Sequence, residues 1–492
     1  MPHGTAALCT DFYELGTIGG LDAVLHELES SRGTGVDILL SPFVAAVLGI
    51  GDFGNLGRFG VDDMIALLEH DDCVELREWN CWSAWLPIED QRRVYETALR
   101  RRRTIGGHLE GLAGPTLQAS IALGIRSEHE AVTAHEALER VELGATVQIR
   151  GGSAARDFAD LVPAITEHGA DPGLFSFCTD EQELASMAES GHIDRLVRRA
   201  IREGVPPIDA VRMATLNAAR GIGVDNDYGS ITPGRVASIV AVEELASLPI
   251  AKVFSRGALA AEDGAYRLAP PPAQYGPEAR ESIVIRRPLT RDDFLFELPD
   301  GDIEVRVIGI TPGRLATEER IETVAFLDGR PQGADGVARI AVIDRHLGGQ
   351  ERALGLIRGL DVADGAVAMT ANPGMMNLVV VGVDEDDMCL AASRVAELGG
   401  GFAVAAHGRI HAEVALPIRG IVSDAPSGEV VERCIAVEHA IRDAMGSPFD
   451  GFISAAGFAC LAVSIPSLKI TSRGLARVSR SEPTEAVPFR IR

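Results

Sequence analysis

The sequence predicts an α/β fold: a (β/α)8 barrel of the TIM type that begins at its second strand, followed by a separate C-terminal α/β domain. Short apolar runs separated by helical stretches are typical of a parallel α/β sheet. The runs cover residues 5–10, 35–42, 73–78, 104–108, 124–129, 145–152 and 174–180. A complete barrel has eight strand–helix units, so these seven runs indicate a barrel without its first strand.

Charged and imidazole side chains stand where four of these runs end, and they are the second observation behind the barrel. Glu78, His108, His129 and Asp180 each close a run. Because the carboxyl ends of barrel strands meet at one mouth, which carries the chemistry of such barrels, we expect these side chains to converge. Imidazole and carboxylate ligands together suit a divalent transition metal such as Mn, Fe or Zn. The sequence therefore predicts a metal site.

Asp180 is the candidate for proton transfer at that site. A metal lowers the pKa of a bound water, and Asp180 can take the proton and pass it to a leaving nitrogen. Plainer interpretations stay open. Asp180 or Thr179 is also suited to cap the next helix, and a lone histidine is usually a satisfied core or surface residue.

Four segments are expected along the chain. They are a barrel at 1–222, part of a small β-sandwich at 223–268, a linker at 269–280, and a C-terminal α/β domain at 281–492. The linker is rich in proline, and Pro233 followed by Gly234 marks a turn in the segment before it. A barrel without its first strand has open edges that must be paired with another chain or element, or else aggregate. We also expect a homo-oligomer.

The composition is that of an ordinary globular protein of 492 residues. Its net charge of −25 argues against non-specific binding to nucleic acid or anionic membranes. The seven cysteines are scattered without a CxxC pair, as in a reducing compartment. No signal-peptide pattern is visible, and the apolar run at 455–466 is too short to span a bilayer. We expect a cytoplasmic protein whose partner is a small-molecule substrate, with no nucleic acid or membrane.

Several longer motifs resemble the bacterial adenine deaminase family of the amidohydrolase superfamily, and the resemblance covers nearly the whole chain. In the first half the matching stretches are PHGT at 2–5, GGHLEGLAG at 106–114, SEHE at 127–130, IRGGSAAR at 149–156, CTDE at 178–181 and MATLNAAR at 213–220. In the second half they include NLVVVGVDEDDM at 377–388 and LPIRGIVSD at 416–424.

The resemblance implies metal-dependent hydrolysis of adenine to hypoxanthine and ammonia, a reaction of purine salvage and adenine catabolism. Matched by position, Glu78 resembles the family's bridging carboxylate, and His108 and His129 resemble ligands. Asp180 resembles the catalytic aspartate. We expect Glu78 to act in catalysis beside Asp180, and we expect Asp180 to be a metal ligand as well.

Arg150 and Ser153, in the matching stretch IRGGSAAR, are candidate contacts to the purine. A salt bridge is an equally common role for an arginine at a strand end. Trp79, Trp82 and Trp85 follow the bridging carboxylate, and we interpret them as packing residues.

The sequence departs from the family at several places. The family's His-x-His pair, from its first barrel strand, precedes the stretch that matches PHGT and is not in this sequence. Tyr13 replaces a family histidine, and residues 371–377 lack two more. We therefore expect at most one well-held ion and little activity in this form. Two alternatives stay open: an impaired homologue that binds a ligand or partner subunit, and an amidohydrolase of another heterocycle.

Overall fold

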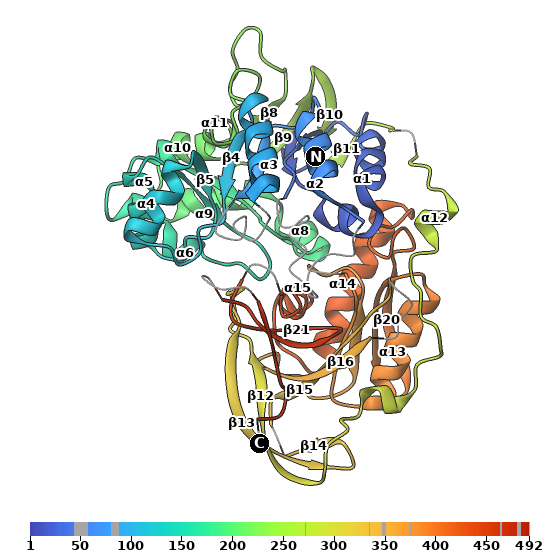
Figure 1. The fold of residues 1–492 in the computed structure, drawn as a ribbon. Helices are drawn as coiled ribbons and strands as arrows, with labels where there is room; N and C mark the ends of the chain where they lie inside the picture. The colour runs from blue at the N-terminus through green and yellow to red at the C-terminus, as the bar shows by residue number, and fades with distance from the viewer. Residues whose placement is uncertain are drawn as a thin grey trace.

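The computed structural model describes residues 1–43, 58–79, 88–270, 272–333, 335–346, 351–373, 376–462, 465–479 and 484–491. Figure 1 shows two halves stacked on each other, an N-terminal half in blue to green and a C-terminal half in yellow to red. We use these names for residues 1–268 and 281–492. Among the described residues, no helix is both long and apolar enough to cross a bilayer.

The N-terminal half is built on seven parallel strands that lie side by side in chain order. β1 pairs with β2, and β3 to β7 form a five-stranded sheet. Single parallel bridges from Leu40 to Cys73 and from Phe43 to Arg77 join β2 to β3. The strands are β1 Ala7–Thr10, β2 Asp37–Leu40, β3 Glu75–Trp79, β4 Thr104–Gly107, β5 Ile125–Glu128, β6 Thr146–Arg150 and β7 Phe175–Cys178.

Each of the seven predicted runs overlaps one of these strands, so the barrel-type sheet is confirmed. Within the described ranges, β1 pairs only with β2 and β7 only with β6. These two strands are therefore the open edges that the sequence predicts.

Helices follow the strands and cover the outside of the sheet (Figure 1). Alternation along the strands explains this packing: Val147, Ile149, Phe175 and Phe177 join an apolar cluster with the helices. Arg150, the last residue of β6, follows Ile149 directly, so its side chain points to the opposite face of the sheet. The helices are α1 Tyr13–Ser30, α2 Val61–Glu69, α3 Ile88–Arg100, α4 Gly114–Ala122, α5 Ala134–Glu142, α6 Phe158–Leu161, α7 Pro163–Thr166, η4 Pro172–Leu174, α8 Leu184–Ser190, α9 Ile193–Arg202, α10 Pro207–Met213 and α11 Leu216–Gly221.

A four-stranded antiparallel sheet, in the order β11-β10-β9-β8, completes the N-terminal half. Its strands are β8 Ile239–Val242, β9 Ile250–Ser255, β10 Ala258–Glu262 and β11 Ala265–Tyr266. Residues 267–270 and 272–276 then run without regular secondary structure. The division of the chain into four segments stays a proposal, and this irregular stretch lies where it places the linker.

The C-terminal half is mostly sheet. Among its described residues, nine strands lie in the order β14-β13-β12-β16-β15-β18-β17-β19-β20, and only β12 and β16 of these pair in parallel. A further sheet has the order β21-β22-β23. The strands are β12 Gly301–Gly309, β13 Glu318–Leu327, β14 Arg330–Gln332, β15 Val337–Ile343, β16 Arg352–Arg358, β17 Ala366–Met369, β18 Leu378–Gly382, β19 Gly401–Ala406, β20 Arg409–Ala415, β21 Leu468–Thr471, β22 Gly474–Arg477 and β23 Glu485–Val487.

Helices cover both faces of the nine-stranded sheet, which explains its almost wholly apolar central strands. On β18, Leu378 and Val380 pack toward α13, whereas Val379 and Val381 pack toward α14 and α15. An α/β domain was expected here, in which strands and helices alternate. Instead, the seven described strands β12 to β18 precede α13. The helices are α12 Pro277–Arg280, η5 Arg291–Phe294, α13 Glu385–Glu397, α14 Ser427–Asp443 and α15 Phe452–Phe458.

The two halves share one apolar core at the carboxyl edge of the parallel strands. Leu109 and Ala154, from the loops after β4 and β6, cluster with Leu315, Phe458 and Val478 of the C-terminal half. The same cluster contains Trp79, which packs on Tyr95 at 5.4 Å between ring centroids. Trp79 therefore has the packing role we expected, whereas Trp82 and Trp85 lie outside the described residues.

The contact between α8 and α14 brings carboxyl groups of the two halves together. Glu183, just before α8, accepts a hydrogen bond from the N–H of Ser454 at 2.8 Å. Burial, and then the carboxylate of Glu183, raise the pKa of Glu438 on α14 to about 8. The folded protein therefore holds a proton at Glu438 that the unfolded chain releases at lower pH.

This raised pKa predicts a pH-dependent loss of stability. Because the folded state binds the extra proton, the free energy of unfolding should fall as pH rises from about 4.5 to about 8. Glu438→Gln keeps a neutral side chain at every pH. The melting temperature of the variant minus that of the wild type should therefore increase from pH 5 to pH 8. Glu432→Gln, on the exposed side of the same helix, is the control. A constant difference in melting temperature between Glu438→Gln and wild type across this pH range would contradict the prediction.

Candidate metal centre

The four predicted ligands stand at the carboxyl ends of adjacent strands. Glu78 is the penultimate residue of β3, and His108 and His129 each lie one residue beyond β4 and β5. Asp180 comes two residues after β7. Since β3 to β7 are parallel neighbours, all four side chains start from the same edge of the sheet.

Three of the four approach directly, and the fourth joins them through an arginine. The rings of His108 and His129 have centroids 5.7 Å apart and stand at 83° to each other. His129 Nε2 lies 3.5 Å from Glu78 Oε1. Arg150 Nη1 lies 3.1 Å from Asp180 Oδ2. The predicted convergence of these residues is present, while their roles as ligands stay a proposal.

Glu130 is a member of this centre that the sequence analysis did not single out. Its Oε1 lies 3.4 Å from His108 Nε2 and 3.4 Å from His129 Nε2. The ligand atoms of His108, His129 and Glu130 all lie within 4.8 Å of one another, and all three residues are buried. The signal for Glu130 in the sequence is the stretch SEHE, where a second carboxylate directly follows His129; a pattern of one ligand for each strand end does not include it.

Unusual backbone conformations direct two carboxylates toward the centre. Glu78 has a φ of +57°, in the left-handed region, and the pairing of β3 with β4 shifts register beside it. Such a bulge re-aims a side chain at the end of a strand. Asp180 has a φ of +64°, a conformation that aspartate tolerates better than most residues. Because α8 begins only at Leu184, Asp180 is not the helix cap of the plainer interpretation.

A buried ion pair fixes the loops that carry the two histidines. Arg140 on α5 lies 2.9 Å from Glu128 Oε1 and donates to the carbonyl of Leu109 at 2.6 Å. Glu128 in turn accepts the N–H of Glu130 at 2.9 Å. Arg140 thereby ties the loop after β4 to the loop after β5. Partners of this kind orient metal ligands and contribute to metal affinity.

The electrostatics of the centre suit a bound cation. Burial, followed by the charge of Arg150, lowers the pKa of His108 to about 3, and burial lowers that of His129 as well. Both imidazoles are therefore neutral, the form that ligates metals. Burial raises the pKa of Glu78 to about 8 and also raises that of Glu130. A donor set of two neutral imidazoles and buried carboxylates fits a divalent transition ion.

The two candidate substrate contacts have protein partners. Arg150 donates to Glu130 Oε1 at 2.6 Å, to Asp180 Oδ2 at 3.1 Å and to Asp157 Oδ2 at 2.9 Å. The hydroxyl of Ser153 accepts the N–H of Glu183 at 3.0 Å. The salt-bridge role of Arg150 is thus present in the structure, and contact of either residue with a purine stays a prediction.

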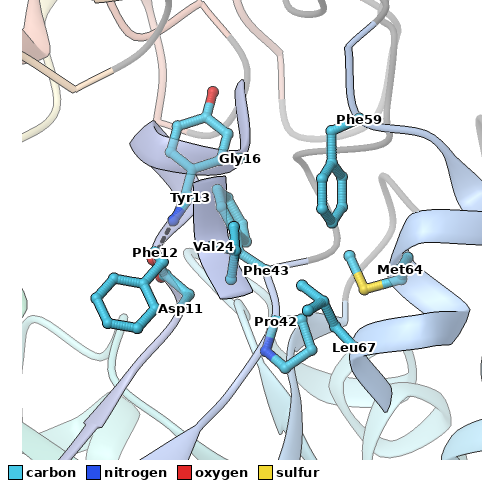
Figure 2. A pocket seen from close by; sticks show the side chains of 10 residues that line it. All are labelled: Asp11, Phe12, Tyr13, Gly16, Val24, Pro42, Phe43, Phe59, Met64 and Leu67. Carbon is cyan, nitrogen blue, oxygen red and sulfur yellow. Dashed lines mark hydrogen bonds between the residues drawn. The ribbon is translucent and has the colours of Figure 1, made fainter. Parts of the chain in front are cut away.

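A small cavity lies beside the centre, at the carboxyl end of β1. Figure 2 shows the ten side chains that line it, among them Asp11, whose Oδ1 accepts the N–H of Tyr13 at 2.8 Å. Tyr13 packs edge-on against Phe43 with ring centroids 4.9 Å apart. The cavity volume is about 10 Å³, which is room for about one water molecule. Tyr13, which stands where the family has a histidine, is therefore part of the packed wall of this cavity.

A sheet of parallel strands that gathers imidazoles and carboxylates at its carboxyl edge is the arrangement of a hydrolase of the amidohydrolase type. Comparisons with known proteins agree with this class. A model of the amidohydrolase family matches residues 97–260, and a model of the adenine deaminase C-terminal domain matches residues 314–482.

Curated relatives extend the match over almost the whole chain. An adenine deaminase from Cereibacter sphaeroides is 37% identical over 485 residues, which cover 98% of this chain and 83% of the relative. An adenine deaminase from Methylobacterium nodulans is 36% identical with the same coverage. One from Clostridium botulinum is 32% identical, covering 98% and 81%. The chain therefore belongs to the adenine deaminase family of amidohydrolases, hydrolases that act on C–N bonds, and the resemblance seen in the sequence is confirmed.

Solved structures are more distant. A β-aspartyl dipeptidase from Fervidobacterium islandicum AW-1 is 14% identical and aligns with a TM-score of 0.40, covering 54% of this chain and 74% of the other.

Proposed function

We propose that this chain catalyses the hydrolytic deamination of adenine to hypoxanthine and ammonia, with a divalent transition metal at the centre formed by His108, His129 and Glu130. The observation that carries the proposal is the convergence of two neutral imidazoles and a buried carboxylate within 4.8 Å in a member of the adenine deaminase family. Manganese, iron and zinc all suit this donor set. Glu78 and Asp180 would complete the ligands from the neighbouring strands.

A bound divalent cation would supply a water that ionises near neutral pH. The protein's own contribution is the arrangement of proton carriers around it. Asp180 is less buried than the other acids, with 20% of its side chain exposed, so it stands on the side from which a substrate arrives. We assign to Asp180 the removal of a proton from the attacking water and its delivery to the departing amino nitrogen.

Arg150 supports this assignment by fixing the position of Asp180. Its guanidinium donates to Asp180 and to Glu130 through the same nitrogen, Nη1. A charge-assisted hydrogen bond of this kind is short and directional, so it holds the carboxyl group in one orientation. Asp180 therefore has the orientation that the proposed proton transfer requires.

The wider setting of the protein is part of the same proposal. Adenine is a small neutral substrate, and a net charge of −25 fits a protein that binds neither nucleic acid nor an anionic membrane. We place the reaction in the cytoplasm, in purine salvage or adenine catabolism.

The test is ammonia release and hypoxanthine formation from adenine, with purified protein supplied in turn with manganese, iron or zinc. Adenosine is the matched control substrate, because its amino group is the same and only the added sugar differs. Slow turnover of adenine with at least one metal is the expected result. Absence of turnover with all three would contradict the proposal, and turnover of another aminated heterocycle alone would keep the reaction type but change the substrate.

A further inference from the structure

A series of ion pairs, buried at its inner end, runs from the metal centre into the C-terminal half. Arg150 donates to Asp157 Oδ2 through Nε at 2.9 Å, and its Nη2 lies 2.7 Å from the same oxygen. The second oxygen of Asp157 accepts from Arg314 Nη1 at 2.8 Å. Arg314 lies at the outer end of the series, near the surface, where its Nη2 donates to Asp160 Oδ2 at 2.8 Å. Asp157 is thus held on one oxygen by each of two guanidinium groups.

The strength of each ion pair in this series depends on its burial. The side chains of Arg150 and Asp157 are 3% and 1% exposed, so their ion pair is shielded from solvent. Arg314 is 37% exposed and Asp160 is 50% exposed, so their pair is screened and weak. The contact of Arg314 that matters is therefore the one with buried Asp157. Breaking a buried pair by removing one partner has large consequences for the partner that remains.

Arg314 comes from the turn between β12 and β13, which reaches across to the loop after β6. The carbonyl of Gly313 accepts the N–H of Arg156 at 3.1 Å, and Arg156 itself donates to the carbonyl of Ser153 at 2.8 Å. The turn therefore docks on the N-terminal half by its backbone as well as by Arg314. This backbone contact keeps Arg314 beside Asp157.

We propose that Arg314 is a positioning residue for the metal centre, acting through Asp157 on Arg150. The inference rests on the proposed function in that it takes His108, His129 and Glu130 as the ligands. With Arg314 present, Asp157 divides its charge between two guanidinium groups and cannot rotate. Without Arg314, Asp157 would interact with Arg150 alone and draw it away from Glu130 and Asp180, which Arg150 orients. The C-terminal half thereby sets the geometry of ligands that lie entirely in the N-terminal half.

The experiment measures binding of Co²⁺ alone to the full-length protein, by titration and by the visible absorption spectrum, which reports coordination geometry. Arg314→Ala should weaken Co²⁺ binding by about 10-fold, the lower end of the cost of losing an outer partner of a metal ligand. Its spectrum should also change. Arg314→Lys keeps a cation beside Asp157 and should restore part of the affinity. The matched control is Arg320→Ala in β13, whose exposed guanidinium pairs with Glu318.

Three outcomes separate the possibilities. A lower melting temperature for Arg314→Ala, with wild-type Co²⁺ affinity and spectrum, would show that Arg314 only clamps the two halves and would overturn the inference. Altered Co²⁺ binding in Arg314→Ala, with wild-type binding in Arg320→Ala, would support it. If that altered binding is found while the wild-type protein fails to deaminate adenine, the inference stands and only the proposed activity falls.

Discussion

Replacing Asp180 with asparagine should lower the turnover number for adenine by about 10²–10⁴-fold, the usual contribution of a positioned general acid–base group. Asparagine has nearly the same shape and can still accept from Arg150 Nη1, now 3.1 Å from Asp180 Oδ2. It cannot take up a proton at neutral pH. The loss should therefore appear in kcat, measured by ammonia release at saturating adenine, with a smaller change in KM.

Metal analysis of the same variant separates the two roles proposed for Asp180. His108, His129 and Glu130 lie within 4.8 Å of one another without it, so Asp180→Asn should keep most of its bound metal. The control is Asp209→Asn on α10, whose carboxylate faces Arg212 at 3.5 Å on the outside of the barrel. Wild-type turnover in Asp180→Asn would remove Asp180 from the mechanism. Joint loss of metal and turnover would make it primarily a ligand.

The parallel sheet could be predicted because its signals are local. Each strand is a short apolar run followed by a helical stretch, and β7, for example, has Phe175, Ser176 and Phe177 all buried. The topology then follows from the rule that consecutive strand–helix units place their strands side by side and parallel. The C-terminal half was harder to predict. There β12 pairs in parallel with β16 across the three intervening strands β13, β14 and β15, and this pairing has no local signature.

The candidate centre was predictable to the same extent. Glu78, His108, His129 and Asp180 could be named because each stands at the end of a run, and strand order then brings them together. Glu130 follows a strand end by two residues, and its direction depends on the backbone turn that Glu128 fixes by accepting its N–H. Such a turn cannot be read from the spacing of residues.

Long-range partners were beyond the reach of the sequence. The role of Arg150 depends on Asp157, seven residues along the chain, and on Arg314, which lies 157 residues beyond Asp157. An arginine at a strand end is compatible with a salt bridge or a substrate contact until these partners are known. The packing of Tyr13 against Phe43 likewise depends on how β1 and β2 pair.

The double variant His108→Ala/His129→Ala should lose its bound metal. The two imidazoles face Glu130 Oε1 at 3.4 Å each, and removing both leaves only carboxylates. We expect affinity for Zn²⁺ or Mn²⁺ to fall by more than about 100-fold, since even outer-shell changes cost about 10–100-fold. Metal content after dialysis is the first measurement. The matched control is His407→Ala/His411→Ala, which removes two exposed imidazoles from the β19–β20 hairpin.

Thermal unfolding gives a second, independent reading of the same site. A ligand that binds only the folded state stabilises it by about 2.7 kcal/mol at a free concentration 100 times its dissociation constant. Added metal should therefore raise the melting temperature of the wild type and of the His407→Ala/His411→Ala control, but not that of His108→Ala/His129→Ala. Equal metal content and equal thermal shifts in both double variants would place the ion elsewhere. In that case the convergence of His108, His129 and Glu130 would be a buried polar cluster of the barrel core, and the metal-dependent mechanism would lose its site.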